Sequence, residues 1–145
     1  TLFPYTTLFR SYPTVSGKYW ILKLPTIPAG KKFPFIEKPV SERKYPVVMA
    51  ALGKEKKIVN LSLPDNVTVK SMPENIKVSN SVGALSIDCK QEGNKIIYTY
   101  QFELNKMVIP VSEYKQLKEL YETASKKADE VILLEKKETS SKPVG

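Results

Sequence analysis

The sequence predicts a mainly β fold: an antiparallel β-sandwich of about seven to eight strands with one amphipathic helix near the C-terminal end. Three observations support it. Eleven prolines and six glycines divide the 145 residues into short pieces, which favours strands over long helices. Apolar and polar residues alternate through much of residues 57–104, as in a sheet with one buried face. After Ser112 the apolar spacing becomes helical.

The first part of the chain is irregular. Residues 18–24 predict a strand with Trp20, Leu22 and Leu24 on one face. Residues 25–43 contain four prolines and no clear period, so we expect a loop or an irregular edge there. Residues 45–52 predict a second strand that begins at an edge or a bulge, because Pro46 cannot donate to a sheet.

The middle of the chain is the most regular part. Alternating residues predict five strands of one antiparallel sheet, with turns at Pro64-Asp65-Asn66, Met72–Asn75, Asn80–Gly83 and Glu92-Gly93-Asn94. The predicted strands cover residues 57–63, 67–70, 76–78, 85–90 and 95–104.

A helix is predicted over about residues 112–128, from apolar residues at helical spacing. Ser112 is the expected N-cap, and Lys126 and Lys127 suit the negative end of the helix dipole. Residues 130–135 predict a strand that is either buried on both faces or the last edge strand under the helix. Residues 138–145 predict a disordered tail.

The N-terminal segment stands apart from this domain. Residues 1–11 resemble a translated sequencing adapter of the kind found in metagenomic fragments, although an ordinary terminal strand is the alternative. We therefore expect residues 1–11 to be non-native and the domain to span residues 12–137.

The missing residue types limit the possible chemistry. The chain has no histidine, which excludes a Ser-His-Asp triad, a Cys-His dyad and an imidazole metal site within it. One cysteine excludes an intrachain disulfide and a thiolate metal cluster. The net charge is +8, but only Arg10 and Arg43 are arginines, and no aromatic–basic cluster occurs, so we expect a lysine-coated surface and no nucleic-acid partner.

No membrane span is expected either. The longest apolar run is residues 47–52, far shorter than the roughly 20 residues that a membrane-spanning helix needs.

Cys89 is the one candidate nucleophile. It continues the apolar face of Leu85 and Ile87, so its thiol should be buried and unreactive. The carboxylates that could form an acid–base pair fall on predicted solvent faces and turns, where nothing would desolvate one of them. These residues are Asp88, Glu92, Glu103 and Glu113.

Aromatic residues could instead form a ligand platform. Tyr98, Tyr100 and Phe102 share one face with apolar neighbours, so core packing is the favoured interpretation, and the same holds for Trp20. Tyr19 and Ile97 are better candidates for exposed contacts. Arg43 suits a structural ion pair with a carboxylate of a neighbouring loop. No residue is assigned a catalytic, cofactor-binding or metal-binding role.

Taken in order, several short segments resemble a known family. The segments are Lys18–Pro25, Ser41–Arg43, Pro46-Val47, Leu63-Pro64, Met72–Glu74, Val78–Asn80, Gly83, Gly93-Asn94, Leu104–Lys106, Ile109-Pro110, Tyr114 and Val131–Leu134. Together they resemble the C-terminal domain of unknown function that follows a transglutaminase-like domain in bacterial envelope proteins. The similarity covers roughly residues 12–137.

The resemblance implies an immunoglobulin-like β-sandwich with one packed helix, downstream of a Cys-His-Asp papain-like domain. It implies a periplasmic or cell-surface location. The expected function is a non-catalytic accessory domain that needs no cofactor and braces the transglutaminase-like domain or helps to present its substrate. The alternative is a module that binds carbohydrate or an envelope protein.

Overall fold

A computed structural model describes residues 14–24, 43–50 and 52–138 of the chain. The adapter-like segment 1–11, nearly all of the predicted loop and residues 139–145 of the predicted tail lie outside the described residues.

The described residues form ten strands and two helical segments. The strands are β1 (Thr14–Ser16), β2 (Tyr19–Lys23), β3 (Val47–Val48), β4 (Gly53–Ser62), β5 (Val67–Ser71), β6 (Ile76–Ser79), β7 (Gly83–Glu92), β8 (Lys95–Leu104), β9 (Val108–Ile109) and β10 (Val131–Lys136). A 3-10 turn, η2 (Val111–Glu113), leads into the helix α2 (Tyr114–Ala128). The mainly β, sandwich-like fold with one helix is therefore confirmed. The strand count is higher than expected because β1 and β9, with three and two residues, are too short to show a period.

The longest strands form one antiparallel sheet with the order β4-β8-β7-β6, which we call the long sheet. Strands β4, β7 and β8 have ten residues each. A two-residue turn joins β7 to β8, and Gly93 adopts a φ of +60° at its first position, as in a type II′ hairpin. The inner face of the long sheet carries the predicted core. Its buried residues include Leu85, Ile87, Cys89, Ile96, Tyr98 and Tyr100.

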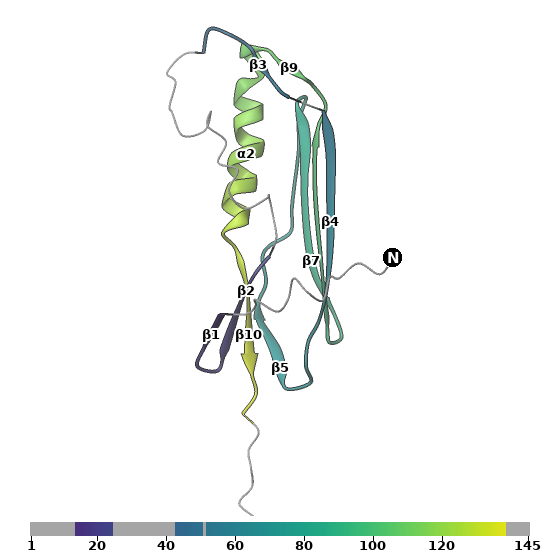
Figure 1. The fold of residues 1–145 in the computed structure, drawn as a ribbon, viewed down its shortest axis with the longest axis vertical. Helices are drawn as coiled ribbons and strands as arrows, with labels where there is room; N and C mark the ends of the chain where they lie inside the picture. The colour runs from purple at the N-terminus through teal and green to yellow at the C-terminus, as the bar shows by residue number, and fades with distance from the viewer. Residues whose placement is uncertain (1–13, 25–42, 51, 139–145) are drawn as a thin grey trace, which may run out of the picture.

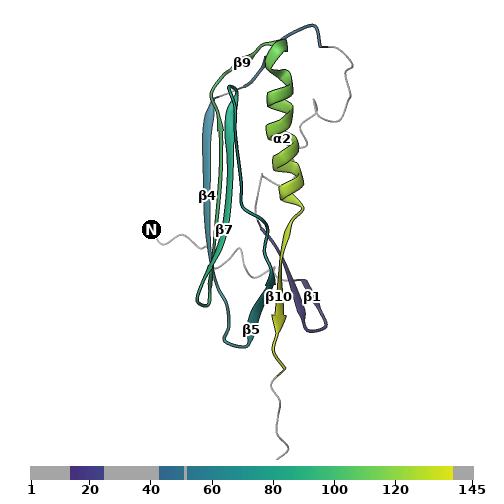
Figure 2. The same cartoon turned by 180° about the vertical axis from the view of Figure 1, so that it is seen from behind.

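The second layer consists of two parts placed one after the other along the molecule (Figures 1 and 2). Helix α2 covers one part of the long sheet, with Leu117, Leu120, Tyr121 and Ala124 buried. The sheet β1-β2-β10-β5, which we call the end sheet, forms the other part. Because β10 follows α2 directly and Ile132 and Leu134 join the same buried cluster as the helix, the two parts share one core.

The position of β10 differs from both predicted alternatives. It is the central strand of the end sheet, paired with β2 and β5, so it is not an edge strand. Ile132 and Leu134 are buried on one face, whereas Val131 and Leu133 on the other face are only partly buried. The strand also includes Lys136, one residue beyond the predicted range of residues 130–135.

The prediction of one five-stranded sheet is wrong, since β5 pairs with β10 in the end sheet and not with a strand of the long sheet. The turn at Pro64 joins two sheets, and buried residues flank it on both sides, Leu63 and Val67. Period-two alternation shows that a strand has a buried face, but it does not identify the sheet to which the strand belongs.

The strand predicted over residues 45–52 is also mostly wrong. Of the described residues in this range, only Val47–Val48 form a strand, paired with β9. The Met49 amide donates to the Met107 carbonyl at 2.7 Å. Pro110 follows β9 directly and has no N–H with which to extend the pairing.

The predicted N-cap is wrong as well. Ser112 lies inside η2, and Glu113 occupies the N-cap position of α2 without a side-chain cap bond. The expected basic residues of the last turn, Lys126 and Lys127, are confirmed.

A substitution at Gly83 tests how tightly β7 packs beside β8. A Cβ atom at Gly83 would overlap the carbonyl oxygen of Glu103 and lie 3.2 Å from its carbonyl carbon. Because these atoms belong to the backbone, we expect Gly83→Ala to lower the free energy of unfolding by about 1–3 kcal/mol in urea denaturation. Gly53→Ala is the matched control, since a Cβ there meets nothing within 4 Å. Equal stabilities for the two variants would contradict this packing.

Candidate functional site

Cys89 lies on the inner face of β7, as predicted, and its side chain is 6% exposed. The Asn75 side chain anchors the strand there, because its Oδ1 accepts a hydrogen bond from the Cys89 amide at 2.7 Å. Burial raises the pKa of the thiol, and the charge of Asp88 raises it further. A buried thiol with a raised pKa carries little thiolate, so Cys89 packs as a small apolar residue.

The aromatic residues of β8 also belong to the core, as predicted. Tyr98 and Tyr100 are each 1% exposed, and burial raises the pKa of both phenols. Phe102 is partly buried and packs against Tyr121 of α2, with ring centroids 5.3 Å apart. These rings fill the space between the long sheet and the helix, which leaves them unable to form an exposed ligand platform.

The remaining candidates, Trp20, Tyr19 and Ile97, differ in exposure. Trp20 is partly buried and packs against the core. Tyr19 is 38% exposed, with the Lys18 ammonium 5.4 Å from its ring centroid. Ile97 is only partly exposed. Of these three residues, Tyr19 is therefore the one that the structure leaves open to a partner.

The four candidate carboxylates each have a separate partner. Asp88 accepts a hydrogen bond from the Asn75 amide at 2.7 Å. Glu92 pairs with Lys90 at 3.1 Å, Glu103 with Lys54 at 3.8 Å and Glu113 with Lys106 at 2.7 Å. Within the described parts of the chain, no three acidic, cysteine or histidine residues form a group that could hold a metal ion.

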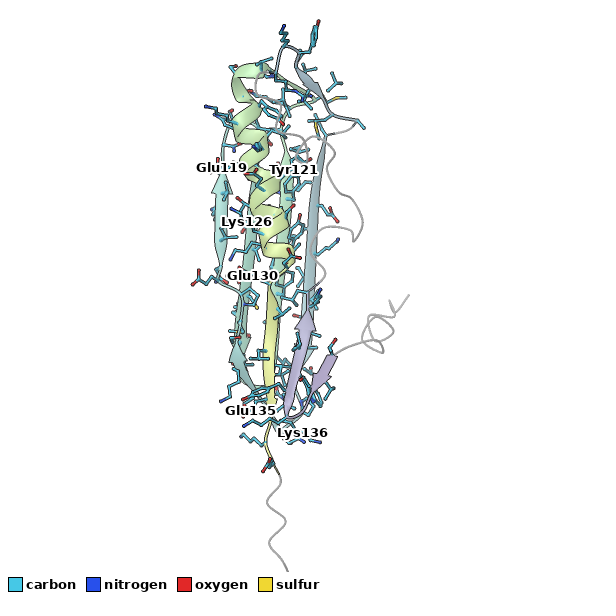
Figure 3. All side chains as sticks on the ribbon, turned by 90° about the vertical axis from the view of Figure 1, so that its left-hand side faces the viewer. Glu119, Tyr121, Lys126, Glu130, Glu135 and Lys136 are labelled. Carbon is cyan, nitrogen blue, oxygen red and sulfur yellow. The ribbon has the colours of Figure 1, made fainter. Side chains whose placement is uncertain are left out.

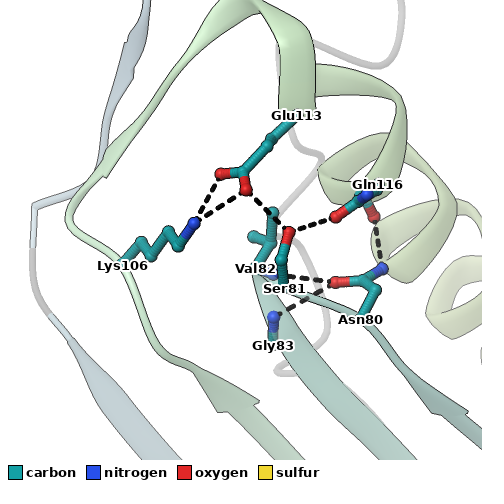
Figure 4. Close-up of polar contacts among 7 residues, drawn as sticks. All are labelled: Asn80, Ser81, Val82, Gly83, Lys106, Glu113 and Gln116. Atoms are coloured by element: carbon teal, nitrogen blue, oxygen red, sulfur yellow. Dashed lines mark hydrogen bonds and ion pairs between the residues drawn. The ribbon is translucent and has the colours of Figure 1, made fainter.

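Glu113 belongs to a polar cluster, which we call the helix-start cluster (Figure 4). Both carboxylate oxygens accept from the Lys106 ammonium, at 2.7 and 2.8 Å. The Ser81 hydroxyl donates to Glu113 Oε1 at 2.8 Å and also contacts Gln116 Oε1. The Asn80 side-chain amide donates to the Gln116 carbonyl at 3.1 Å. The cluster thus ties the β6–β7 turn and the segment after β8 to the beginning of α2.

This cluster is organised for attachment and not for nucleophilic catalysis. The hydrogen bond from Lys106 lowers the pKa of Glu113, and the hydrogen bond from Ser81 adds to that effect, while burial opposes it. A carboxylate with a lowered pKa is a weak base, so it does not activate the Ser81 hydroxyl. The side chain of Glu113 is engaged with Lys106 and Ser81 and does not form the capping bond of α2.

The sequence could not have indicated this cluster, since 32 residues separate Ser81 from Glu113. The sequence predicted only the turn at Asn80–Gly83. The side chain of Asn80 stabilises that turn, because its Oδ1 accepts from the amides of Val82 and Gly83 at 3.0 and 3.2 Å.

A second ionic contact lies in the end sheet. Glu135 on β10 pairs with Lys18 and Lys70, both at 2.7 Å, and these hydrogen bonds lower the pKa of the carboxyl group. Lys18 immediately precedes β2 and Lys70 lies on β5, so Glu135 links the central strand to both neighbours. Figure 3 shows Glu135 near the end of β10 that is remote from α2.

Between these contacts, Glu130 lies at the junction of α2 and β10 (Figure 3). Its Oε1 pairs with Lys127 at 2.7 Å, and Lys127 also donates to the Glu74 carbonyl at 3.3 Å. Glu130 Oε2 and the Tyr98 hydroxyl are buried without a hydrogen-bond partner. Lys127 binds both Glu130 and the Glu74 carbonyl, so it ties the end of α2 to the loop before β6.

The predicted ion pair of Arg43 is not found among the described residues. Its guanidinium instead lies over the ring of Tyr114, 4.9 Å from the centroid, and its Nε is buried without a hydrogen-bond partner. Arg43 therefore packs against the start of α2 through a cation–π contact.

This fold can be set beside those of known proteins. The model of a family described as a domain of unknown function with a solved structure (DUF3858) matches residues 19–134. The chain belongs to this family. The DUF3858 match covers the long sheet, α2 and the first four residues of β10. No curated protein matches the chain.

A solved structure shares the DUF3858 fold of this chain. It is a protein of Parabacteroides distasonis ATCC 8503 described as a "putative protease", with a TM-score of 0.65 and 20% sequence identity. The match covers 83% of this chain but 24% of that one, so this chain spans about a quarter of that protein's length.

No helix in the described part of the chain is long and apolar enough to cross a membrane.

The titration of Glu113 checks the helix-start cluster. Because its pKa is lowered below the ordinary value of 4.5, the stability from this cluster is complete above that pH and is lost as the pH falls through the folded-state pKa. We expect an NMR titration of the Glu113 carboxyl carbon to give a pKa below 4.5. Lys106→Met should raise that pKa more than Ser81→Ala does. A pKa that Lys106→Met leaves unchanged would contradict the assigned contact.

Proposed function

We propose that this chain is a non-catalytic accessory domain of a longer bacterial envelope protein. In that protein it braces a transglutaminase-like catalytic domain or helps to present its substrate. A periplasmic or cell-surface location is part of the proposal, as is the absence of a cofactor. Membership in the DUF3858 family and the likeness to one part of a longer protein support an accessory role.

The observation that carries this proposal is the burial of Cys89, the only cysteine of the chain. A papain-like mechanism needs an accessible thiolate beside an imidazole. Here the thiol is packed in the core with a raised pKa, and the chain has no histidine. The polar side chains of the helix-start cluster and Glu135 are engaged in contacts between elements. The chain thus supplies rigidity, and the chemistry belongs to the rest of the longer protein.

The alternative, a carbohydrate-binding module, would be favoured by neighbouring exposed aromatic residues. The exposed aromatic residues of the described parts are Tyr19, at the β1–β2 turn, and Tyr45, beside β3. These strands lie at opposite ends of the molecule (Figure 1). The two rings therefore cannot stack on one sugar, and the accessory function is the one that we propose.

The direct test uses the longer protein encoded by the same gene. We expect deletion of residues 19–134 to lower the thermal midpoint and the amine-incorporation or peptide-cleaving activity of its catalytic domain. Supplying the 145-residue chain separately should restore part of the loss. The 145-residue chain alone should have neither activity. Activity in this chain that disappears in Cys89→Ser would refute the proposal, as would a deletion that changes neither stability nor activity.

A further inference from the structure

One end of the molecule carries an apolar surface that is exposed in the part of the chain that the structure describes. Six exposed residues from two chain segments form it, and we call it the tip. They are Tyr45 (78% exposed), Val48 (71%), Val108 (55%), Leu52 (51%), Met107 (45%) and Val111 (41%). The pairing of β3 with β9 joins the two segments. Surface apolar residues are normally scattered singly, so this concentration indicates a contact surface.

The β3–β9 pairing shows what kind of surface should cover the tip. Val47 and Ile109 face inward and are 6% and 0% exposed. Their neighbours Val48 and Val108 also pair with each other, and they face outward. An antiparallel pair commonly has one polar face in contact with solvent, so apolar residues on the outward face of this pair favour a second protein layer over it. The described residues supply one layer, and none of them forms a second layer over the tip.

The charges around the tip exclude a second copy of this chain as the best occupant. Lys44 and Lys115 are exposed in the segments that form this end. Three acidic side chains described near this end are already paired with lysines: Glu55 with Lys57, Glu103 with Lys54 and Glu113 with Lys106. Two tips facing each other would bring like charges together, whereas an acidic rim on the partner would be complementary.

We propose that the tip docks onto another folded domain of the longer protein, at an apolar surface with an acidic rim. This inference rests on the proposed function in assuming a longer chain, and the Parabacteroides distasonis protein provides a precedent, since this fold makes up about a quarter of it. The tip lies at the opposite end of the molecule from the β1–β2 turn and the end of β10 (Figures 1 and 2). A domain joined before Thr14 and docked at the tip would be held at both ends of the long axis, which is the geometry of a brace.

The test compares hydrogen exchange in the 145-residue chain with exchange in the longer protein. We expect peptides covering residues 44–50 and 105–112 to exchange at least about tenfold more slowly in the longer protein. Equal exchange in the two proteins would overturn the docking. Protection that appears in the 145-residue chain as its concentration rises would also overturn it, because the occupant would then be a second copy.

Paired variants separate docking from folding. Tyr45→Ser combined with Val48→Ser should remove the protection in the longer protein, while the isolated chain keeps its thermal midpoint because both side chains are exposed. Val15→Ser combined with Ile58→Ser is the matched control, since these residues are 58% and 50% exposed and lie away from the tip. Loss of protection in the control as well would overturn the assignment. A longer chain without a Cys-His-Asp set would refute the proposed function, yet a protected tip in that same chain would still support docking.

Discussion

The length of the long sheet is the constraint on which the rest of the structure depends. Its ten-residue strands extend about 33 Å, whereas the 15-residue helix α2 is about 22 Å long. A helix of that length cannot cover the buried face of β7 and β8. The end sheet covers what the helix leaves, and β10 continues directly from α2 to do so. The division of the second layer into helix and sheet is therefore a consequence of strand length.

Three charged residues lie at successive positions along this second layer. Glu113 is bound where α2 begins, Glu130 where α2 ends, and Glu135 near the end of β10. Each of them pairs with lysine at 2.7 Å, and the contacts fall at the places where the second layer starts, changes and stops. These contacts fix the layer in position more than they stabilise it, since ion pairs near the surface contribute little free energy. These three carboxylates thus hold elements of the fold together, in keeping with the bracing role proposed above.

The sequence predicted those features that depend on near neighbours in the chain. Alternation gave the buried faces of β7 and β8, and with them the burial of Cys89 and Tyr98. Helical spacing gave α2. The sheet to which β5 belongs was missed because its pairing with β10 joins residues far apart in the chain. The contact of Ser81 with Glu113 and that of Arg43 with Tyr114 were missed for the same reason, since a side chain's partner depends on the tertiary fold.

If one core joins α2 and the end sheet to the long sheet, the described part of the chain should unfold as a unit. Native-state hydrogen exchange in low denaturant measures this directly, strand by strand. The account predicts that the slowest amides of α2, β10 and β8 exchange with the same free energy of opening. Exchange of the β10 amides at a clearly lower free energy, while β8 stays protected, would show that the end sheet opens independently and would contradict the account.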